Sequence, residues 1–331
     1  MESFSDNQSS VETIVFDEKD FIRNFVTNSD SDFDRLLVQK WTEALNKNVF
    51  KYEVTQNSLP SKVLNGKYRM IAQLNEGRAT LRRKPDDMSS IRMPFNDQKF
   101  NYTRIKSEEV LFRLKSSDGQ MEGTVVINNS PIEFCNSLLV PKLEDCRPQV
   151  LTGDALRLAI CMVALSARPN LRVGFNSLGA MASVNHQHFH LYYYDYEMLI
   201  ERLDIENNLL KGWPIDTLVF EIKKICFEEI NECVESVLKL VDYCLKEDKN
   251  IAHNIFITRS ERSGIRVFVW PRDPVFGAKD DSVINPAFCE FTGFFMCKTK
   301  DMFHTIDEEF CVQLLSKVNS RVNDLKHLLS S

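Results

Sequence analysis

Three of the six histidines in this 331-residue chain lie within five positions, at His186, His188 and His190. Side chains of a β-strand alternate between its two faces, so residues two positions apart point the same way. If the segment is a strand, the three imidazoles form a row on one face. Gln187, Phe189 and Leu191 then point to the other face, where the latter two pack. Small residues at 179, 180, 182 and 183 precede the row and would let phosphates approach the backbone closely. The segment therefore predicts a strand that faces a phosphate-binding site.

The amino-acid composition limits the class of protein. Hydrophobic residues make up 43% of the chain and charged residues 27%, as in ordinary globular proteins. A net charge of -6 argues against a nucleic-acid polymer as partner, because such binding needs a basic footprint. The chain shows neither an apolar run of membrane-spanning length nor an N-terminal signal segment, so we expect no membrane contact. The nine cysteines lack Cys-x-x-Cys spacing, which favours reduced thiols in a cytoplasmic protein over disulfides or a zinc ribbon.

The first half of the chain predicts an antiparallel sheet crossed by a helix. Residues 1–30 are rich in Ser, Asn and Asp and are expected to form a disordered tail. Apolar periodicity then predicts helices over 33–45 and 152–168, and strands over 109–114, 124–128, 137–141 and 171–176 before the histidine segment. The connections between these strands are mostly too short for parallel crossovers, so an α+β class with antiparallel pairing follows.

The second half repeats this order of elements. We expect a strand over 218–222, a helix over 226–246, a hairpin over 252–259 and 265–270, a strand over 288–298 and a helix over 307–329. The repetition predicts an internal duplication, with a catalytic half over 31–200 and a degenerate second half over 201–331. The second half would supply stability and one wall of a cleft.

Several basic residues and one further histidine have two interpretations each. The basic stretch at 60–90 is interpreted as a solvated connector, although Arg78, Arg82 or Arg83 could lie near a polyanionic ligand. His253 is interpreted as a core residue, with a place in the cleft as the alternative. Three more cations are either cleft residues or surface charges: Arg259, Arg272 and Lys279.

The histidine row allows three kinds of chemistry. A neutral imidazole is a good nucleophile near pH 7, so the middle histidine could attack phosphorus and carry a nucleotidyl group. Alternating histidines on a strand could instead bind zinc and activate water. The third interpretation is a hydrogen-bonded sheet face without catalysis, which three histidines in alternation make the weakest.

The residues around the row resemble a known superfamily. Ser183-Val-Asn-His-Gln-His-Phe-His190 is similar to the histidine-triad signature, and residues 128–131 with 138–142 resemble its ribose-binding strand pair. The likeness narrows to the GDP-hexose phosphorylases, a branch related to galactose-1-phosphate uridylyltransferase. The segments that carry this closer resemblance are 92–102, 172–186, 251–259, 267–272 and 276–280.

This resemblance implies a duplicated histidine-triad-like α+β fold, with antiparallel sheets and packed helices. It also implies the reaction of GDP-D-glucose with inorganic phosphate to give α-D-glucose 1-phosphate and GDP, without a cofactor or a metal. His188 would attack the α-phosphorus and carry GMP as a covalent guanylyl-histidine. His186 would orient the nucleophile, and His190 would contact the phosphates or the leaving oxygen.

The resemblance also assigns the substrate-binding residues. Asn128 matches the ribose contact, Asn176 and Ser183 match phosphate contacts, and Asn185 is grouped with them. For Asn176, a polar turn residue is the competing interpretation.

The sequence departs from its relatives at two places and leaves several choices open. The third triad position is His190, where uridylyltransferases and the plant enzymes have glutamine. Residues 133–136 replace a Gly-His pair that relatives often have. Guanine and glucose follow from the resemblance alone, and a homodimer is kept as a candidate assembly. The alternative functions are a histidine-triad hydrolase acting on a GDP-sugar or related nucleotide, and a non-enzymatic nucleotide-binding protein.

Overall fold

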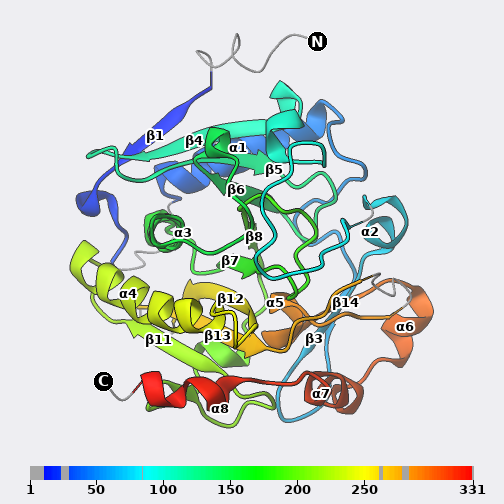
Figure 1. The fold of residues 1–331 in the computed structure, drawn as a ribbon. Coiled ribbons are helices and arrows are strands. Elements are labelled where there is room, and N and C mark those ends of the chain that lie inside the picture. The colour runs from blue at the N-terminus through cyan, green and yellow to red at the C-terminus, as the bar shows by residue number, and fades with distance from the viewer. Residues whose placement is uncertain (1–10, 24–29, 84, 261–263, 278–282, 330–331) are drawn as a thin grey trace.

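One large sheet of eleven strands runs through the molecule in the order β1-β4-β5-β6-β8-β7-β12-β13-β11-β10-β9 (Figure 1). The computed structural model describes residues 11–23, 30–83, 85–260, 264–277 and 283–329. The strands are β1 (Thr13–Phe16), β4 (Val110–Ser116), β5 (Glu122–Ile127), β6 (Ser137–Pro141), β7 (Leu171–Asn176), β8 (Phe189–Tyr193), β9 (Ile205–Glu206), β10 (Leu209–Leu210), β11 (Leu218–Ile222), β12 (Ala252–Arg259) and β13 (Ile265–Arg272).

Three helices cover one face of this sheet. They are α1 (Asp32–Asn46), α3 (Gly153–Leu165) and α4 (Phe227–Cys244), and all three were expected from the apolar periodicity. Ser31 and Asp34 form a capping box that starts α1, and Trp41 is completely buried on its inner face. Nearly every residue of α3 is buried, because this helix packs between the sheet and α4. The largest hydrophobic core lies here, between the three helices and the sheet.

The opposite face of the sheet carries a second core and a small three-stranded sheet. The small sheet has the order β14-β3-β2, from β14 (Phe294–Cys297), β3 (Ile71–Leu74) and β2 (Ser61–Val63). Beside it lie α6 (Lys300–Thr305) and α7 (Glu308–Ser316), at the lower right of Figure 1. The remaining helices are α2 (Glu76–Leu81), α5 (Phe288–Phe291) and α8 (Val322–Leu325). Tyr192 belongs to this second core, whereas Leu191 belongs to the first. His190, which alternates with Leu191, therefore points toward the small-sheet side.

Strands from the two halves of the sequence pair with each other in both sheets. β7 pairs with β12 in the large sheet, and β14 pairs with β3 in the small one. Each half also supplies its own antiparallel strands with a helix across them, β5-β6-β8-β7 with α3 and β12-β13-β11 with α4. The predicted α+β class with a duplicated unit is confirmed. Two pairings are parallel, β1 with β4 and β14 with β3, which the expectation of antiparallel sheets did not include.

The prediction of a disordered tail to residue 30 is wrong for residues 11–23. Residues 13–16 form β1 at the edge of the large sheet, and Phe16 and Phe21 are buried. The strand has only four residues, and two aromatic anchors in a polar stretch give no periodic signal. Residues 1–10 and 24–29 lie outside the described residues.

Three other segments differ from the expected elements. The stretch at 60–90, interpreted as a connector, forms β2, β3 and α2. The strand expected over 288–298 is a helix, α5, followed by β14, and Gly293 turns the chain between them with a positive φ of 90°. A continuous apolar run does not distinguish a short buried helix from a strand. The helix expected over 307–329 is divided into α7 and α8, with a bridge between Arg272 and Ser320 at the break.

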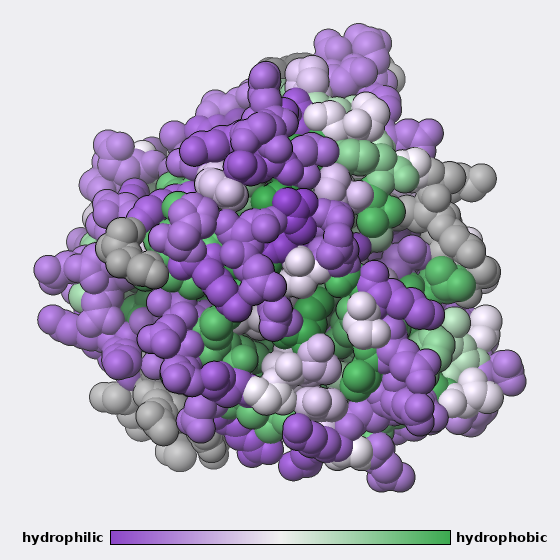
Figure 2. All heavy atoms as spheres, turned by 60° about the horizontal axis from the view of Figure 1, so that its bottom comes forward, coloured by the Kyte–Doolittle hydropathy of each residue, from purple (hydrophilic) through white to green (hydrophobic). Residues whose placement is uncertain are grey.

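The described residues contain no helix that combines the length and the apolar character needed to cross a membrane. Figure 2 shows the face that carries the lower elements of Figure 1. Most of this face is hydrophilic, and its apolar atoms appear in small groups, mainly in recesses between polar side chains. We find no extended apolar surface in this view.

Candidate active site

The histidine segment enters the large sheet only at its end. His190 lies in β8 and is paired with Gly174 of β7 and Leu138 of β6, whereas His186 and His188 precede the strand. The predicted row of three imidazoles on one strand face therefore forms only in part. The rings of His188 and His190 are adjacent, with their centroids 5.3 Å apart. Phe189 and the other residue predicted to pack on the opposite face, Leu191, are completely buried.

The side chain of Gln149 explains why β8 begins after His188. Its Nε2 donates to the carbonyl oxygens of Asn176, at 2.9 Å, and His188, at 3.1 Å. Its Oε1 accepts from the backbone N–H of His188 at 2.8 Å. The amide thus makes the hydrogen bonds that a further β7–β8 pair would make, and it holds the two chain segments apart. This role of Gln149 could not be predicted from the sequence, because its hydrogen-bond partners are distant in the chain.

The backbone fixes the proton position on His188. Its Nδ1 lies 2.8 Å from the carbonyl oxygen of His186. A carbonyl can only accept a hydrogen bond, so Nδ1 carries the proton and Nε2 keeps its lone pair. Burial lowers the pKa of His188 to about 4, so the ring is neutral near pH 7. A neutral imidazole with a free Nε2 is the form that can act as a nucleophile.

The other two histidines differ from His188 in their surroundings. His186 accepts a hydrogen bond at Nδ1 from the backbone N–H of Tyr102, at 3.1 Å, and burial lowers its pKa to about 4. Its carbonyl, and not its imidazole, contacts the ring of His188. His190 is half-buried against Phe288, with ring centroids 5.7 Å apart. Burial first, and then the proximity of other positive groups, keeps the pKa of His190 well below its usual value.

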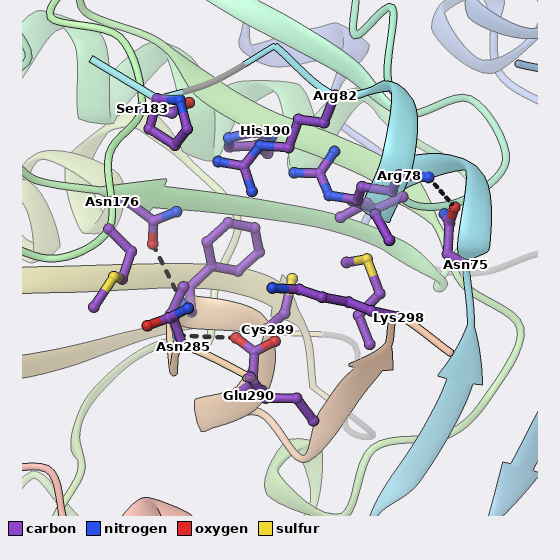
Figure 3. A pocket seen from close by; sticks show the side chains of 18 of the residues that line it. Asn75, Arg78, Arg82, Asn176, Ser183, His190, Asn285, Cys289, Glu290 and Lys298 are labelled. Atoms are coloured by element: carbon purple, nitrogen blue, oxygen red, sulfur yellow. Dashed lines mark hydrogen bonds between the residues drawn. The ribbon is translucent and has the colours of Figure 1, made fainter. Parts of the chain in front are cut away.

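Two adjoining pockets meet at His190, while His188 lines one of them and His186 lines neither. The first, which we name the triad pocket, is lined by His188, Asn128, Ser130, Phe100, Tyr102 and Leu138 among others. The second, which we name the α5 pocket, is lined by Asn176, Asn285, Phe288, Glu290 and Lys298 among others (Figure 3). Five residues line both pockets and form a shared wall: Arg78, Arg82, Arg83, Ser183 and His190. The two pockets therefore form one divided cleft.

The shared wall is cationic in a chain whose net charge is -6. Arg78 donates to the carbonyl oxygen of Ser130. Arg83 pairs with Asp86 at 3.0 Å and lies 4.5 Å from the ring centroid of Phe100. The interpretation of this stretch as a solvated connector is wrong, and its three arginines converge on the cleft. Such a wall suits an anionic ligand, because guanidinium groups bind phosphate oxygens with paired hydrogen bonds.

The α5 pocket also contains a buried carboxyl group. Glu290 caps α5, with its Oε2 accepting from the backbone N–H of Ala287 at 2.9 Å. Burial raises the pKa of this carboxyl to about 7. Figure 3 shows Arg78 and Arg82 on one side of the pocket, with Glu290 and Lys298 across from them. The pocket can therefore accept hydroxyl groups at Glu290 and anionic groups at the arginines. Neither Glu290 nor Lys298 was expected to be a site residue, because the segment was predicted to be one strand.

Three of the four residues predicted to bind substrate line the cleft. Asn128 lines the triad pocket, Asn176 the α5 pocket, and Ser183 both. Asn185 lines neither. It donates to the carbonyl oxygens of Met93 and Pro94 and accepts from the N–H of Gln149, so it holds the aromatic loop beside the site.

Two of the three remaining candidate cations, Arg259 and Arg272, do not line either pocket. Arg259 is buried and donates to the carbonyl oxygens of Ile22 and Ala164 behind α3. Arg272 is buried and donates to the carbonyl oxygen of Pro286. Both expected alternatives, a cleft cation and a surface charge, are wrong for these two residues. Lys279 lies outside the described residues. His253 is a core residue, stacked on Phe175 with centroids 5.9 Å apart.

Within the described ranges, no group of three or more His, Cys, Asp or Glu side chains is placed to hold a metal ion.

Comparison with protein families gives two adjacent matches. Residues 32–192 match the model "GDPGP1-like, N-terminal domain", and residues 197–328 match "GDPGP1-like, C-terminal domain". The chain is 40% identical over 305 residues to GDP-D-glucose phosphorylase 1 of Danio rerio, covering 87% of this chain and 86% of the relative. It is 32% identical over 323 residues to GDP-L-galactose phosphorylase 2 of Arabidopsis thaliana, covering 86% of this chain and 72% of the relative.

A solved structure shares the fold. The chain is similar to yeast Ap4A phosphorylase Apa2 in complex with Ap4A, with a TM-score of 0.61 and 16% sequence identity. The match covers 87% of this chain and 97% of the yeast chain, so the likeness extends over both halves.

Proposed function

The chain belongs to the GDPGP1-like family, and from this premise we propose that it is a nucleotidyltransferase that cleaves GDP-D-glucose with inorganic phosphate. The products are α-D-glucose 1-phosphate and GDP. The observation that carries the proposal is the state of His188. Its ring is neutral, its Nδ1 proton is held by a carbonyl, and it lines a pocket with a cationic wall.

The reaction proceeds in two transfers. His188 Nε2 attacks the α-phosphorus of GDP-D-glucose, and the bond from that phosphorus to the bridging oxygen breaks. Glucose 1-phosphate leaves, and GMP remains on the histidine. An oxygen of inorganic phosphate then attacks the same phosphorus, the P–N bond breaks, and GDP leaves. Because the acceptor replaces the leaving group in the same place, one cationic wall serves both steps.

The two pockets suggest how the substrate lies. The triad pocket offers aromatic and apolar walls and is also lined by Asn128, which suits a nucleoside. The α5 pocket offers Asn285, Glu290 and Lys298, which suit a hexose with its phosphate. The phosphates then lie along the shared wall, beside Ser183 and the arginines. His190 separates the pockets and is placed to contact the leaving oxygen.

Replacement of the nucleophile tests the proposal. We expect His188→Asn to lower phosphorolysis of GDP-D-glucose by at least about 1000-fold, because the variant lacks the imidazole Nε2 that is proposed to carry GMP. Incubation of the wild type with GDP-D-glucose, without phosphate, should add the mass of a GMP group to the peptide that contains residue 188. The variant should show no such addition. The exposed His304→Asn is the matched control and should keep wild-type activity.

Other outcomes would change the assignment. Retained turnover in His188→Asn would exclude the covalent route. Formation of GMP at a rate independent of phosphate would identify a hydrolase instead. Binding of GDP-D-glucose without any turnover would identify a nucleotide-binding protein.

A further inference from the structure

A buried amide on β12 controls a residue of the cleft. Asn254 is completely buried and is the register partner of Asn176 across the β7–β12 pair. Its Nδ2 donates to Asn176 Oδ1 at 2.6 Å and to the carbonyl oxygen of Ala180 at 2.8 Å. Its own Oδ1 is buried and has no hydrogen-bond partner among the described residues. An unpaired buried carbonyl lowers stability, so a role in stability alone does not account for an amide here.

Two backbone groups fix the orientation of both amides. The carbonyl of Ala180 can only accept, so the Asn254 atom that faces it must be the nitrogen. That nitrogen also faces Asn176, whose near atom must then be its oxygen. The backbone N–H of Phe288 donates to the same Asn176 oxygen, at 3.3 Å, and independently requires the same assignment. The Nδ2 of Asn176 is left on the pocket side.

The close-up view agrees with this assignment. Figure 3 shows the oxygen of Asn176 turned toward α5 and its nitrogen turned into the α5 pocket. Phosphate oxygens are hydrogen-bond acceptors, so an N–H group in this place attracts them. If the amide were turned over, its carbonyl oxygen would face the phosphate and repel it. The orientation of the Asn176 amide therefore decides whether the side chain attracts or repels a phosphate oxygen.

We propose that Asn254 is a positioning residue, which holds the Asn176 amide with its N–H groups toward the phosphates of the substrate. This inference rests on the proposed function, because it assumes that phosphates occupy the shared wall beside the α5 pocket. Asn254 acts only through Asn176 and touches no substrate. Through the β7–β12 pair, a residue in the second half of the chain thus sets the orientation of a cleft residue in the first half.

A double-mutant cycle with Asn176→Ala tests the proposal. Asn254→Asp keeps the size of the side chain but replaces the donor by a second acceptor, which repels Asn176 Oδ1 and turns its amide. We expect kcat/KM for GDP-D-glucose to fall about 100-fold in Asn254→Asp and in Asn176→Ala alone. The double variant should be no worse than Asn176→Ala, because the effect of residue 254 passes through residue 176. Losses that multiply to about 10,000-fold would overturn the proposal.

Controls separate positioning from folding and from the choice of reaction. Thr258 lies on β12, the strand that carries Asn254, and its side chain donates a buried hydrogen bond to Glu201. Thr258→Val removes this bond, and it should lower the melting temperature without changing kcat/KM. If Asn254→Asp does not fold, Asn254→Ala replaces it in the cycle, with an expected loss of kcat/KM of about 10-fold and the same lack of additivity.

The affinity for GDP, measured by calorimetry, allows the same double-mutant cycle to be followed without turnover. A wild type that binds GDP but does not cleave GDP-D-glucose would refute the proposed function, and the binding cycle would still decide the role of Asn254.

Discussion

At the scale of single residues, backbone groups set the direction of the polar side chains in the cleft. A carbonyl oxygen holds the proton of His188, and a backbone N–H holds the oxygen of Asn176. Backbone groups have fixed donor and acceptor roles and do not titrate near neutral pH. The site is therefore preorganised, and its polar groups need no rearrangement as charge moves during transfer.

The carboxyl of Glu290 gives a prediction about sugar recognition. Glu290→Gln keeps the size of the side chain, and its remaining oxygen can still accept from the N–H of Ala287. It loses the acceptor capacity that a carboxyl offers to hexose hydroxyls. We expect kcat/KM for GDP-D-glucose to fall by about 10- to 100-fold, with the affinity for GDP unchanged. Steady-state kinetics and GDP titration provide the two measurements.

Glu133→Gln is the matched control for this experiment. Burial raises the pKa of Glu133 to about 7 as well, but this residue lines a different pocket, beside Tyr194 and Asp195. The variant should leave the kinetics with GDP-D-glucose unchanged. An equal loss in both variants would show that the effect arises from a buried carboxyl in general and not from hexose recognition.

At the scale of elements, the position of His188, the proposed nucleophile, depends on how β7 and β8 diverge. Gln149→Met keeps the length of the side chain but removes three hydrogen bonds, two of them to the backbone of His188. Because buried backbone groups are left unpaired, we expect the free energy of unfolding to fall by about 2–4 kcal/mol. We also expect kcat to fall at least about 10-fold, since the ring of His188 is no longer held. Urea unfolding and steady-state kinetics measure the two effects.

Gln187→Met provides the comparison. Its amide is buried beside the histidines but donates to Val150 and Thr152, at the start of α3. This variant should lose stability while its kcat stays within about threefold of the wild type. A loss of kcat as large as that of Gln149→Met would contradict the role assigned to Gln149.

Elements with long periodic patterns could be predicted from the sequence, and short ones could not. The helices α1, α3 and α4 and the central strands have apolar spacing that repeats over several turns or residues. The four residues of β1 are too few for a pattern, and the apolar run at 288–298 fits a helix and a strand equally well.

The same limit of local information applies to the site. The placement of His188 and His190 in the cleft could be predicted, because the three histidines lie within five residues and their spacing carries the signal. Gln149, Asn254 and Glu290 reach the site only through tertiary packing. Asn254 lies in segment 251–259, which carries the family resemblance, but the resemblance assigned no role to this residue. The three arginines of the wall were visible in the sequence, but nothing local distinguished a cleft from a surface.

At the scale of the whole molecule, buried histidines couple stability to pH. Burial lowers the pKa of His186, His188 and His253 to about 4, below the usual 6.5. The unfolded chain takes up protons at these groups as pH falls from 6.5 to 4, and the folded chain does not. Their contribution to stability is therefore full above pH 6.5 and is lost on acidification, at about 1.4 kcal/mol per pH unit for each group.

Buried carboxyl groups with raised pKa values act in the opposite direction. Burial raises the pKa of Glu133 and Glu290 to about 7, so the folded chain keeps protons that the unfolded chain releases above pH 4.5. Their contribution is full below pH 4.5 and is lost as pH rises through 7. The effects of the histidines and of the carboxyl groups on the free energy of unfolding partly cancel. The overall pH dependence of stability therefore does not measure the contribution of the histidines alone.

A variant of one core histidine isolates the effect. His253 lies outside both pockets, so His253→Phe should keep activity while removing one titrating group. We expect the fall in the free energy of unfolding between pH 6.5 and 4 to become shallower by about 1.4 kcal/mol per pH unit. Urea unfolding at several pH values measures this slope. An unchanged slope would show that protonation of His253 is not linked to unfolding.

The pairing of β7 with β12 has a consequence for synthesis on the ribosome. β12 begins roughly 75 residues after β7 ends, and at about 5–20 residues per second this corresponds to about 4–15 s of translation. During this interval the first half has left the exit tunnel ahead of its partner strand, and β7 presents an open sheet edge. Open edges recruit other strands, including those of neighbouring nascent chains. The order of synthesis thus leaves the β12 side of β7 without its partner strand until the second half of the chain has been made.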